Sequence, residues 1–340
     1  MIQFEDLKIT TMTLIFELDG SINKLSTFHL LPITKINIKP QRESNKCKLP
    51  YCGIHGAIIS LRYRNSVRGI IKNTKKNFKN AVTVDICTSL KNLSLKISPN
   101  TIQLCGAMSR ENGIEAVQYV LNYLNDIKLN INYIQQHPEE YQEHVAYLKE
   151  NSKGELTDKV IYDCYNTTNG ILYIEKTVPD YFIKPVALNT PLMNFLWSLT
   201  NDQLYYQDYT AILDNLIYLK PVYNEDLGLK SVNEVMVNYN YNLGFKVNRD
   251  QLHQLIDNRN GFYSHYDNAL NNSVTVELPY DDSVLVYKAK KKKKKIAHHT
   301  FLIYSSGAVT QSGPCLGHIM KEAYELFIQT IDEIKPLIML

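Results

Sequence analysis

The chain has 340 residues, of which 44% are hydrophobic and 21% charged, a balance typical of a protein with a buried core. No apolar run reaches the roughly 18 residues that span a bilayer, and the chain does not begin with a signal peptide, so neither a membrane protein nor a secreted one is expected. The six cysteines are scattered without a CxxC pair, which indicates reduced thiols.

The first part of the chain predicts a unit of strands and helices. Residues 9–14 read as a first strand, and a short helical segment follows around Leu25. Residues 82–86 alternate as V-T-V-D-I and lead to a second strand, then to a third that ends at Gly106. An amphipathic helix follows, and residues 57–63 read as an extra strand. In such a unit Val82, Val84 and Ile86 face the helices.

Basic residues gather in two runs although the formal net charge is only +3. Residues 62–79 carry seven basic side chains and no acid, and a second run comprises Lys288 and residues 290–295. Such runs indicate either a solvated edge or a surface that faces a polyanion.

Residues 127–232 match neither of their flanks. Several apolar positions there have helical spacing, and the segment is too apolar for a linker. We interpret it as a partly helical insertion.

The last part of the chain repeats the first pattern. Residues 236–241 read as a first strand, and residues 274–278 alternate as V-T-V-E-L. A strand, a turn and a further strand ending at Gly313 follow, and then an amphipathic helix. Two copies of one unit, almost 200 residues apart, indicate a duplicated fold.

Three stretches within these copies resemble the TATA-box-binding protein (TBP) family. Residues 302–313 are similar to the family's LIFxSGKVVxTG segment, residues 266–270 to its YEPEL, and residues 102–109 to its MVxTGAKS. The resemblance covers about two thirds of the chain. Long insertions and a composition typical of an AT-rich genome fit the divergent versions of large cytoplasmic DNA (giant) viruses best.

This resemblance implies an α+β fold. Two pseudo-symmetric repeats would form one curved antiparallel sheet, a saddle, with helices on its convex face and the insertion between the repeats. The expected boundaries are residues 1–126 for the first repeat, 127–232 for the insertion and 233–340 for the second repeat.

The family binds DNA by laying the underside of the sheet in the minor groove and wedging side chains into base steps. The resemblance gives the wedge positions to Ile97 and Tyr304, and it puts two acids, Asp85 and Glu277, on the same surface. The residues expected to contact DNA are Lys8, Thr10, Phe78, Lys79, Leu95, Ile97, Cys105, Val237, Leu302, Tyr304, Thr310 and Ser312, with Lys290, Lys291, Lys292 and Lys293 in a flanking loop.

The sequence offers no pattern for catalysis or for a cofactor. His298 and His299 lack the spacing of metal ligands to Cys315 and His318, and residues 313–317 lack the ending of a phosphate loop. An enzyme with a saddle-like accessory domain would need a carboxylate cluster in residues 127–232, where the acids have no recognisable spacing. We expect no metal site, no catalytic site and no small-molecule substrate.

The resemblance thus predicts a transcription initiation factor that binds double-stranded promoter DNA and recruits transcription factors or RNA polymerase. The expected location is the viral factory in the host cytoplasm, with the virion as a further one. The alternative is a saddle that has lost DNA bending and serves as a protein-interaction scaffold, which Asp85, Glu277, Val235 and Asn271 favour.

Overall fold

A computed structural model describes most of the chain. The described residues are 3–34, 51, 53–64, 66–69, 80–151, 158–167, 170–179, 195–196, 216, 222–223, 227–281 and 297–340. They form two compact units, one made of residues 1–15, 105–110 and 233–340, and the other of residues 16–104 and 111–232.

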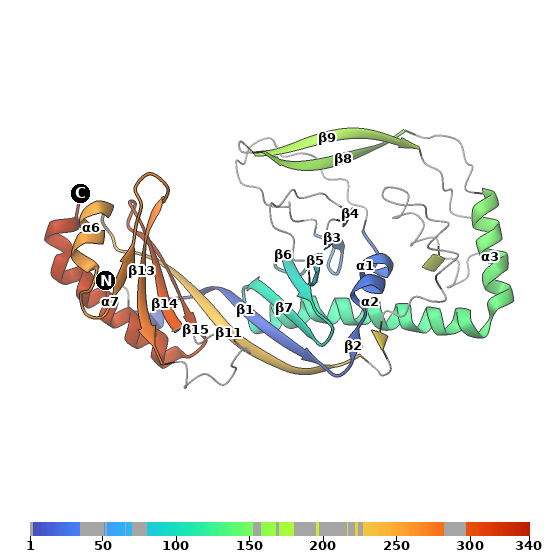
Figure 1. The fold of residues 1–340 in the computed structure, drawn as a ribbon, viewed down its shortest axis with the longest axis horizontal. Coiled ribbons are helices and arrows are strands. Elements are labelled where there is room, and N and C mark those ends of the chain that lie inside the picture. The colour runs from blue at the N-terminus through green and yellow to red at the C-terminus, as the bar shows by residue number, and fades with distance from the viewer. Residues whose placement is uncertain are drawn as a thin grey trace. The chain divides into compact units, whose positions relative to one another are not determined.

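The described elements run in an order that the chain uses twice (Figure 1). A 3-10 helix, η1 (Phe4–Asp6), comes first. The first copy comprises β1 (Ile9–Leu18), β2 (Ser21–Ile22), α1 (Lys24–Leu30), β3 (Ile58–Tyr63), β4 (Ser66–Gly69), β5 (Val82–Cys87), β6 (Asn92–Ile97), β7 (Thr101–Ala107) and α2 (Arg110–Gln136). The second comprises β11 (Leu229–Asn242), α6 (Arg249–Ile256), β12 (Tyr263–His265), β13 (Ser273–Tyr280), β14 (Ala297–Tyr304), β15 (Ala308–Pro314) and α7 (Gly317–Ile338).

Hydrogen bonding arranges the strands of each copy in the same order. The first copy reads β1-β7-β6-β5-β3-β4 and the second β11-β15-β14-β13-β12, so β4 is an addition at the edge of the first. The strand expected at residues 57–63 is β3, and its counterpart is β12. The predicted α+β class, with a large antiparallel sheet and several helices, is confirmed.

The segment between the copies contains its own elements. Helix α3 (Pro138–Asn151) follows α2, and β8 (Asp158–Thr167) pairs with β9 (Gly170–Pro179) as an antiparallel hairpin. Further along, β10 (Val222–Tyr223) pairs with β2. The insertion therefore contains strand as well as helix, and periodicity indicated only its helical part.

Three phenylalanines form the core of the second copy. Phe301 of β14 stacks on Phe327 of α7 with ring centroids 4.3 Å apart, and Phe262 meets both rings edge-on. Helix α6 packs against β13, and α7 against β15 (Figure 1). Gly313 permits this approach, because a Cβ there would collide with Met320 of α7 and with the His299 ring. Both helices thus cover one face of these strands.

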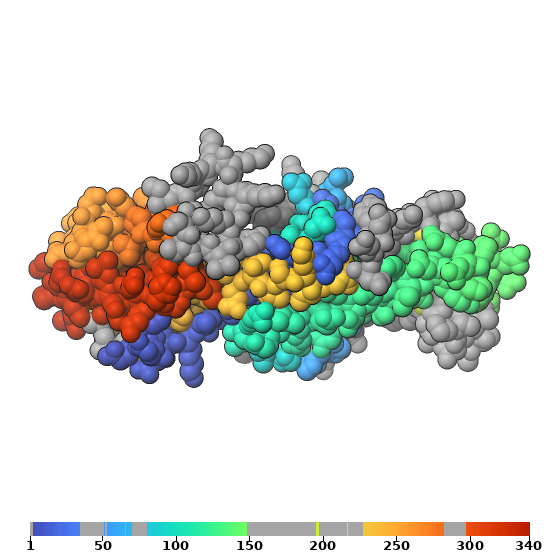
Figure 2. Space-filling view, turned by 90° about the horizontal axis from the view of Figure 1, so that it is seen from below, coloured from blue at the N-terminus to red at the C-terminus, as the bar shows by residue number. Residues whose placement is uncertain are grey.

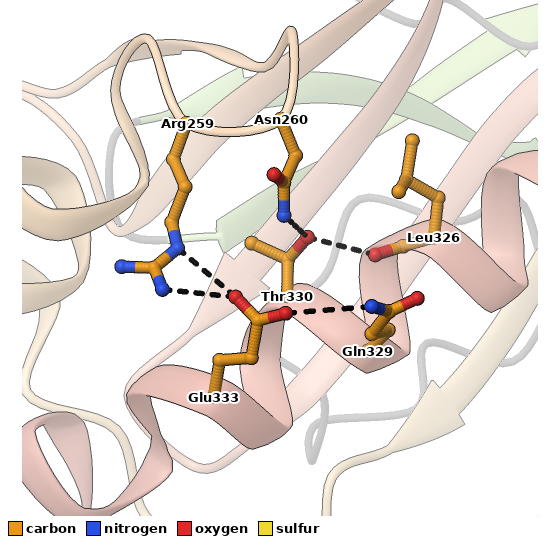
Figure 3. Close-up of polar contacts among 6 residues, drawn as sticks. All are labelled: Arg259, Asn260, Leu326, Gln329, Thr330 and Glu333. Carbon is orange, nitrogen blue, oxygen red and sulfur yellow. Dashed lines mark hydrogen bonds and ion pairs between the residues drawn. The ribbon is translucent and has the colours of Figure 1, made fainter.

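The loop between α6 and β12 is fastened to α7, which lies at the surface of its unit (red in Figure 2). The guanidinium of Arg259 donates to Glu333 at 2.9 and 3.2 Å, and Asn260 donates to the Thr330 hydroxyl at 2.9 Å (Figure 3). Asn260 and Gly261 both have positive φ, which lets the loop turn tightly enough to present these donors.

The first copy uses equivalent devices in its own unit. Asn23 caps α1 by accepting from the backbone of Leu25 and Ser26, as Asn248 caps α6 by accepting from Gln251. The beginning of α2 holds the β5–β6 turn, where Glu115 accepts from the Ser89 amide at 2.8 Å and from its hydroxyl at 2.7 Å.

Candidate nucleic-acid interface

Strand alternation gives the second copy one face opposite its helices, which we call the open face. On the helix side, Val274, Val276, Phe301 and Ile303 are fully buried. Their neighbours in sequence project to the other side, where none of the described side chains of β13 and β14 is fully buried. The open face is therefore a continuous surface over four strands.

Cross-strand pairing arranges the open face in two rows. One row joins Asn240 of β11, Thr310 of β15, Leu302 of β14 and Thr275 of β13. The next joins Asn238, Ser312, Thr300 and Glu277 in the same strand order. Amides and hydroxyls dominate both rows, and Leu302 lies among them with Tyr304 two residues further along β14. Such a surface offers hydrogen-bond donors and acceptors beside an apolar side chain.

Asn238 is the most constrained residue of these rows. Its Nδ2 donates to the Thr11 hydroxyl at 2.8 Å, whereas its Oδ1 is buried without a hydrogen-bond partner among the described residues. Asn240, one pleat further along β11, is exposed. The two amides thus differ, since one is fixed by a neighbour and the other is available to a ligand.

The open face carries one acid and no lysine or arginine in the two rows described above. Glu277 lies 3.8 Å from His265 of β12, measured from its Oε2 to the histidine Nε2. The expectation that Glu277 shares a surface with Leu302 and Thr310 is confirmed by the strand register. Cations for phosphate contact must therefore come from outside these rows.

The corresponding face of the first copy is closed over β3 and β5. Thr83 and Asp85 are buried like Val82 and Val84 on the helix side, so β5 is buried on both faces. Asp85 accepts from the Arg62 guanidinium at 2.8 Å, and the two side chains are only 9% and 10% exposed. Asp85 was expected on the surface that meets DNA. That expectation is wrong, because its charge is paired inside the protein.

The first basic run is also partly internal. Arg68 is 1% exposed, and its guanidinium donates to the Phe28 carbonyl and lies over the Phe28 ring. Two of the seven basic residues in this run, Arg62 and Arg68, are therefore buried and not available to an edge that faces DNA. Arg64 remains at the surface.

The structure brings four predicted contact residues together. Leu302, Tyr304, Thr310 and Ser312 all lie on the open face, and Tyr304 is 36% exposed at the end of β14. Lys8 and Cys105 are exposed, the first just before β1 and the second in β7. Whether any of them contacts DNA stays a prediction.

Four other predicted residues are not on an open face. Leu95 and Ile97 pair with Val84 and Val82, and Val237 pairs with Gly313, so strand geometry directs all three to the helix side, where they are 0–2% exposed. Thr10 is exposed, but it lies on the same side of β1 as buried Met12, which is two residues further along the strand. The residue of β1 that Asn238 contacts is Thr11. These placements are corrected: the motifs located the strands but not their faces.

The remaining predicted residues lie outside the described part of the chain. They are Phe78, Lys79, Lys290, Lys291, Lys292 and Lys293.

Sequence reasoning missed the two asparagines of β11. It named Val237 as the contact of this strand, whereas Asn238 and Asn240 occupy the open face. The signal was the alternation N-Y-N-Y-N over residues 238–242, in which Tyr239 and Tyr241 are buried and the asparagines point away.

The described residues contain neither a membrane-spanning helix nor a cluster of metal ligands. None of their helices is long and apolar enough to cross a membrane. Among them, no three His, Cys, Asp or Glu side chains are grouped so as to hold a metal ion.

Comparison with known proteins gives a distant likeness. No protein-family model matches the sequence, and no curated protein matches it significantly. Among solved structures, the TBP of Methanococcus jannaschii is similar over 96% of this chain and 98% of its own, with 12% sequence identity and a TM-score of 0.40. A likeness at this level carries no argument about function, which has to rest on the residues of the open face.

Proposed function

We propose that the protein is a TBP-like transcription initiation factor, without enzymatic activity, that binds the minor groove of duplex DNA through the open face. One observation carries the proposal: two rows of amide and hydroxyl side chains surround Leu302 and run beside exposed Tyr304. Minor-groove proteins combine polar side chains that read base edges with apolar side chains that enter a base step. Promoter DNA and the transcription machinery are the partners in this proposal.

Charge adds the lysine run at residues 290–293 to the proposed interface. Phosphate neutralisation supplies much of the affinity of DNA-binding proteins, and the two rows contain no cation. The lysine run lies in the sequence between Tyr280 and Ala297, which are paired neighbours at one end of β13 and β14. We include this run in the proposed interface on its charge and its place in the sequence alone.

The place of action is proposed on composition alone. The long insertion and the many Asn, Lys, Ile and Tyr residues suit a large cytoplasmic DNA virus, which would put the protein in the viral factory of the host cytoplasm or in the virion.

A binding assay with a matched pair of variants tests the function. Fluorescence anisotropy at low salt compares an A·T-rich with a G·C-rich duplex, since the minor groove distinguishes chiefly these two. Asn240→Ala should weaken binding to the A·T-rich duplex about tenfold through one lost hydrogen bond. Asn132→Ala, an exposed position on α2, should change nothing. Absence of duplex binding by the folded wild-type protein would refute the proposal.

A second function is favoured by one specific feature. Glu277 lies within the rows, which hold no lysine or arginine, and a carboxylate repels phosphate. This supports the alternative of a protein-interaction scaffold whose open face binds a polypeptide. If the folded protein ignores DNA, and Glu277→Gln does not restore binding, the scaffold becomes the better explanation.

A further inference from the structure

The strand registers reveal which residues of the two copies are equivalent. In the first copy Val82 pairs with Ile97, and in the second Val274 pairs with Ile303. Because the V-T-V segments correspond, Ile97 corresponds to Ile303 and not to Tyr304. The counterpart of Tyr304 is Ser98, the residue after Ile97.

The same registers pair the remaining positions of β6 and β14. Thr83 is opposite Lys96, and Thr275 is opposite Leu302, so Lys96 occupies the position of Leu302. The second copy therefore presents a leucine and a tyrosine where the first presents a lysine and a serine. At these positions of the described strands β6 and β14, apolar side chains suited to wedging therefore occur only in the second copy.

Burial gives the same asymmetry independently. Thr275 and Glu277 are half-buried on the open face, while their counterparts Thr83 and Asp85 are buried. Asp85 also keeps Arg62 in an internal ion pair. Separating this ion pair is costly, because each charge would be left without its partner in a poorly solvated site. Over β3 and β5 the first copy therefore has no free surface for a duplex, which leaves only the end of β6, where Lys96 and Ser98 lie.

We infer that the two copies act unequally on DNA: the second inserts Leu302 and Tyr304 at one base step, the first inserts nothing, and the bound duplex carries one kink. Unstacking a base step requires an apolar side chain that replaces the lost stacking contacts. Lysine and serine prefer water or phosphate and do not supply such contacts. The inference rests on the proposed function and specifies how the same site deforms its ligand.

The experiment uses the full-length protein and a set of duplexes with 2-aminopurine at successive single positions, because this base fluoresces when it unstacks. For the wild type, one step should brighten. Tyr304→Ala should remove that signal and weaken binding about tenfold, while Tyr304→Phe should keep both. Ser98→Ala, the matched change in the first copy, should alter neither.

A gain-of-function variant completes the test. The double substitution Lys96→Leu and Ser98→Tyr gives the first copy the side chains of the second and should create a second bright step. Two bright steps in the wild type, or none in a bound complex, would overturn the inference while leaving the proposed function intact. Failure of the folded protein to bind any duplex would instead remove the proposed function, and the inference with it. Circular dichroism of each variant establishes that it is folded.

Discussion

At the residue scale, His299 shows how a strand position can decide the charge state of a side chain. It lies on the helix side of β14, is 2% exposed and contacts the Tyr280 ring at 4.8 Å between centroids. Its Nδ1 has no hydrogen-bond partner among the described residues. Burial without compensation lowers the pKa of His299 from 6.5 to about 4.

This pKa makes the stability of the second copy depend on pH. The unfolded chain takes up the proton near pH 6.5 and the folded protein only near pH 4, so the stabilisation is complete above 6.5 and declines as the pH falls. Between pH 7.5 and 5 the free energy of unfolding should fall by about 2 kcal/mol from this group.

Urea denaturation of wild type and His299→Leu at the two pH values measures the effect. The variant should lose this part of the pH dependence, whereas His298→Leu, on the open face, should retain it. Equal pH dependence in wild type and His299→Leu would contradict the assignment.

At the element scale, β5 and β13 show what a strand pattern predicts and what it leaves open. Alternation in V-T-V-D-I and V-T-V-E-L located both strands and identified the valines as core. It did not distinguish Asp85, which is buried, from Glu277, which is not, because the difference lies in the neighbours. Arg62 comes from β3, and the local pattern of β5 does not show that β3 pairs with it.

The buried ion pair between β3 and β5 should stabilise its unit only while both partners are present. Asp85→Asn leaves the Arg62 guanidinium poorly compensated and should cost about 3 kcal/mol in the free energy of unfolding. The double variant Arg62→Met with Asp85→Leu removes both charges and should recover most of that loss. Chemical denaturation measures all three proteins, and a double variant as unstable as Asp85→Asn would show that packing, not charge, is at stake.

Ile97 and Tyr304 are not equivalent residues, because the two hairpins differ in length. Counted back from Gly106 and Gly313, Ile97 and Tyr304 lie at the same distance, and the motif match relied on that count. The first hairpin closes with Ser98 donating to the Thr101 carbonyl, whereas Ile303 pairs with Val309 across a longer turn. One extra residue shifts every upstream side chain to the other face of the strand. Strand pairing, not sequence spacing, therefore identifies the equivalent residues.

At the scale of the whole molecule, duplication fixes the order of elements but not equality of the copies. The repeated order of strands could be predicted from the sequence, because each copy carries its own alternation and terminal glycine. Part of the candidate interface could also be predicted, namely Leu302, Tyr304, Thr310, Ser312 and Glu277. Its asparagines and the closure of the first copy could not, since both depend on cross-strand neighbours.

The lysine run gives a prediction that concerns binding by the complete protein. If Lys290, Lys291, Lys292 and Lys293 contact phosphates, replacing each with glutamine should reduce the slope of log K against log salt by about 0.9. Titrations between low and moderate salt measure the slope for successive replacements. Lys246→Gln, an exposed position outside the loop, serves as the control. An unchanged slope in the fourfold variant would assign the run to solvent.

The N-terminal segment has a consequence for the order of events during synthesis. Phe4 packs against the rings of Tyr239 and Tyr324, and Glu5 accepts from Lys321, 316 residues away in sequence. Translation at about 5–20 residues per second separates these partners by roughly 16–63 s. Phe4 and Glu5 therefore wait for partners that are synthesised much later, and the contacts of Phe4 with Tyr239 and Tyr324 form only once those residues are available. Changes to Phe4 or Glu5 should therefore disturb the second copy, although both residues precede the first copy in sequence.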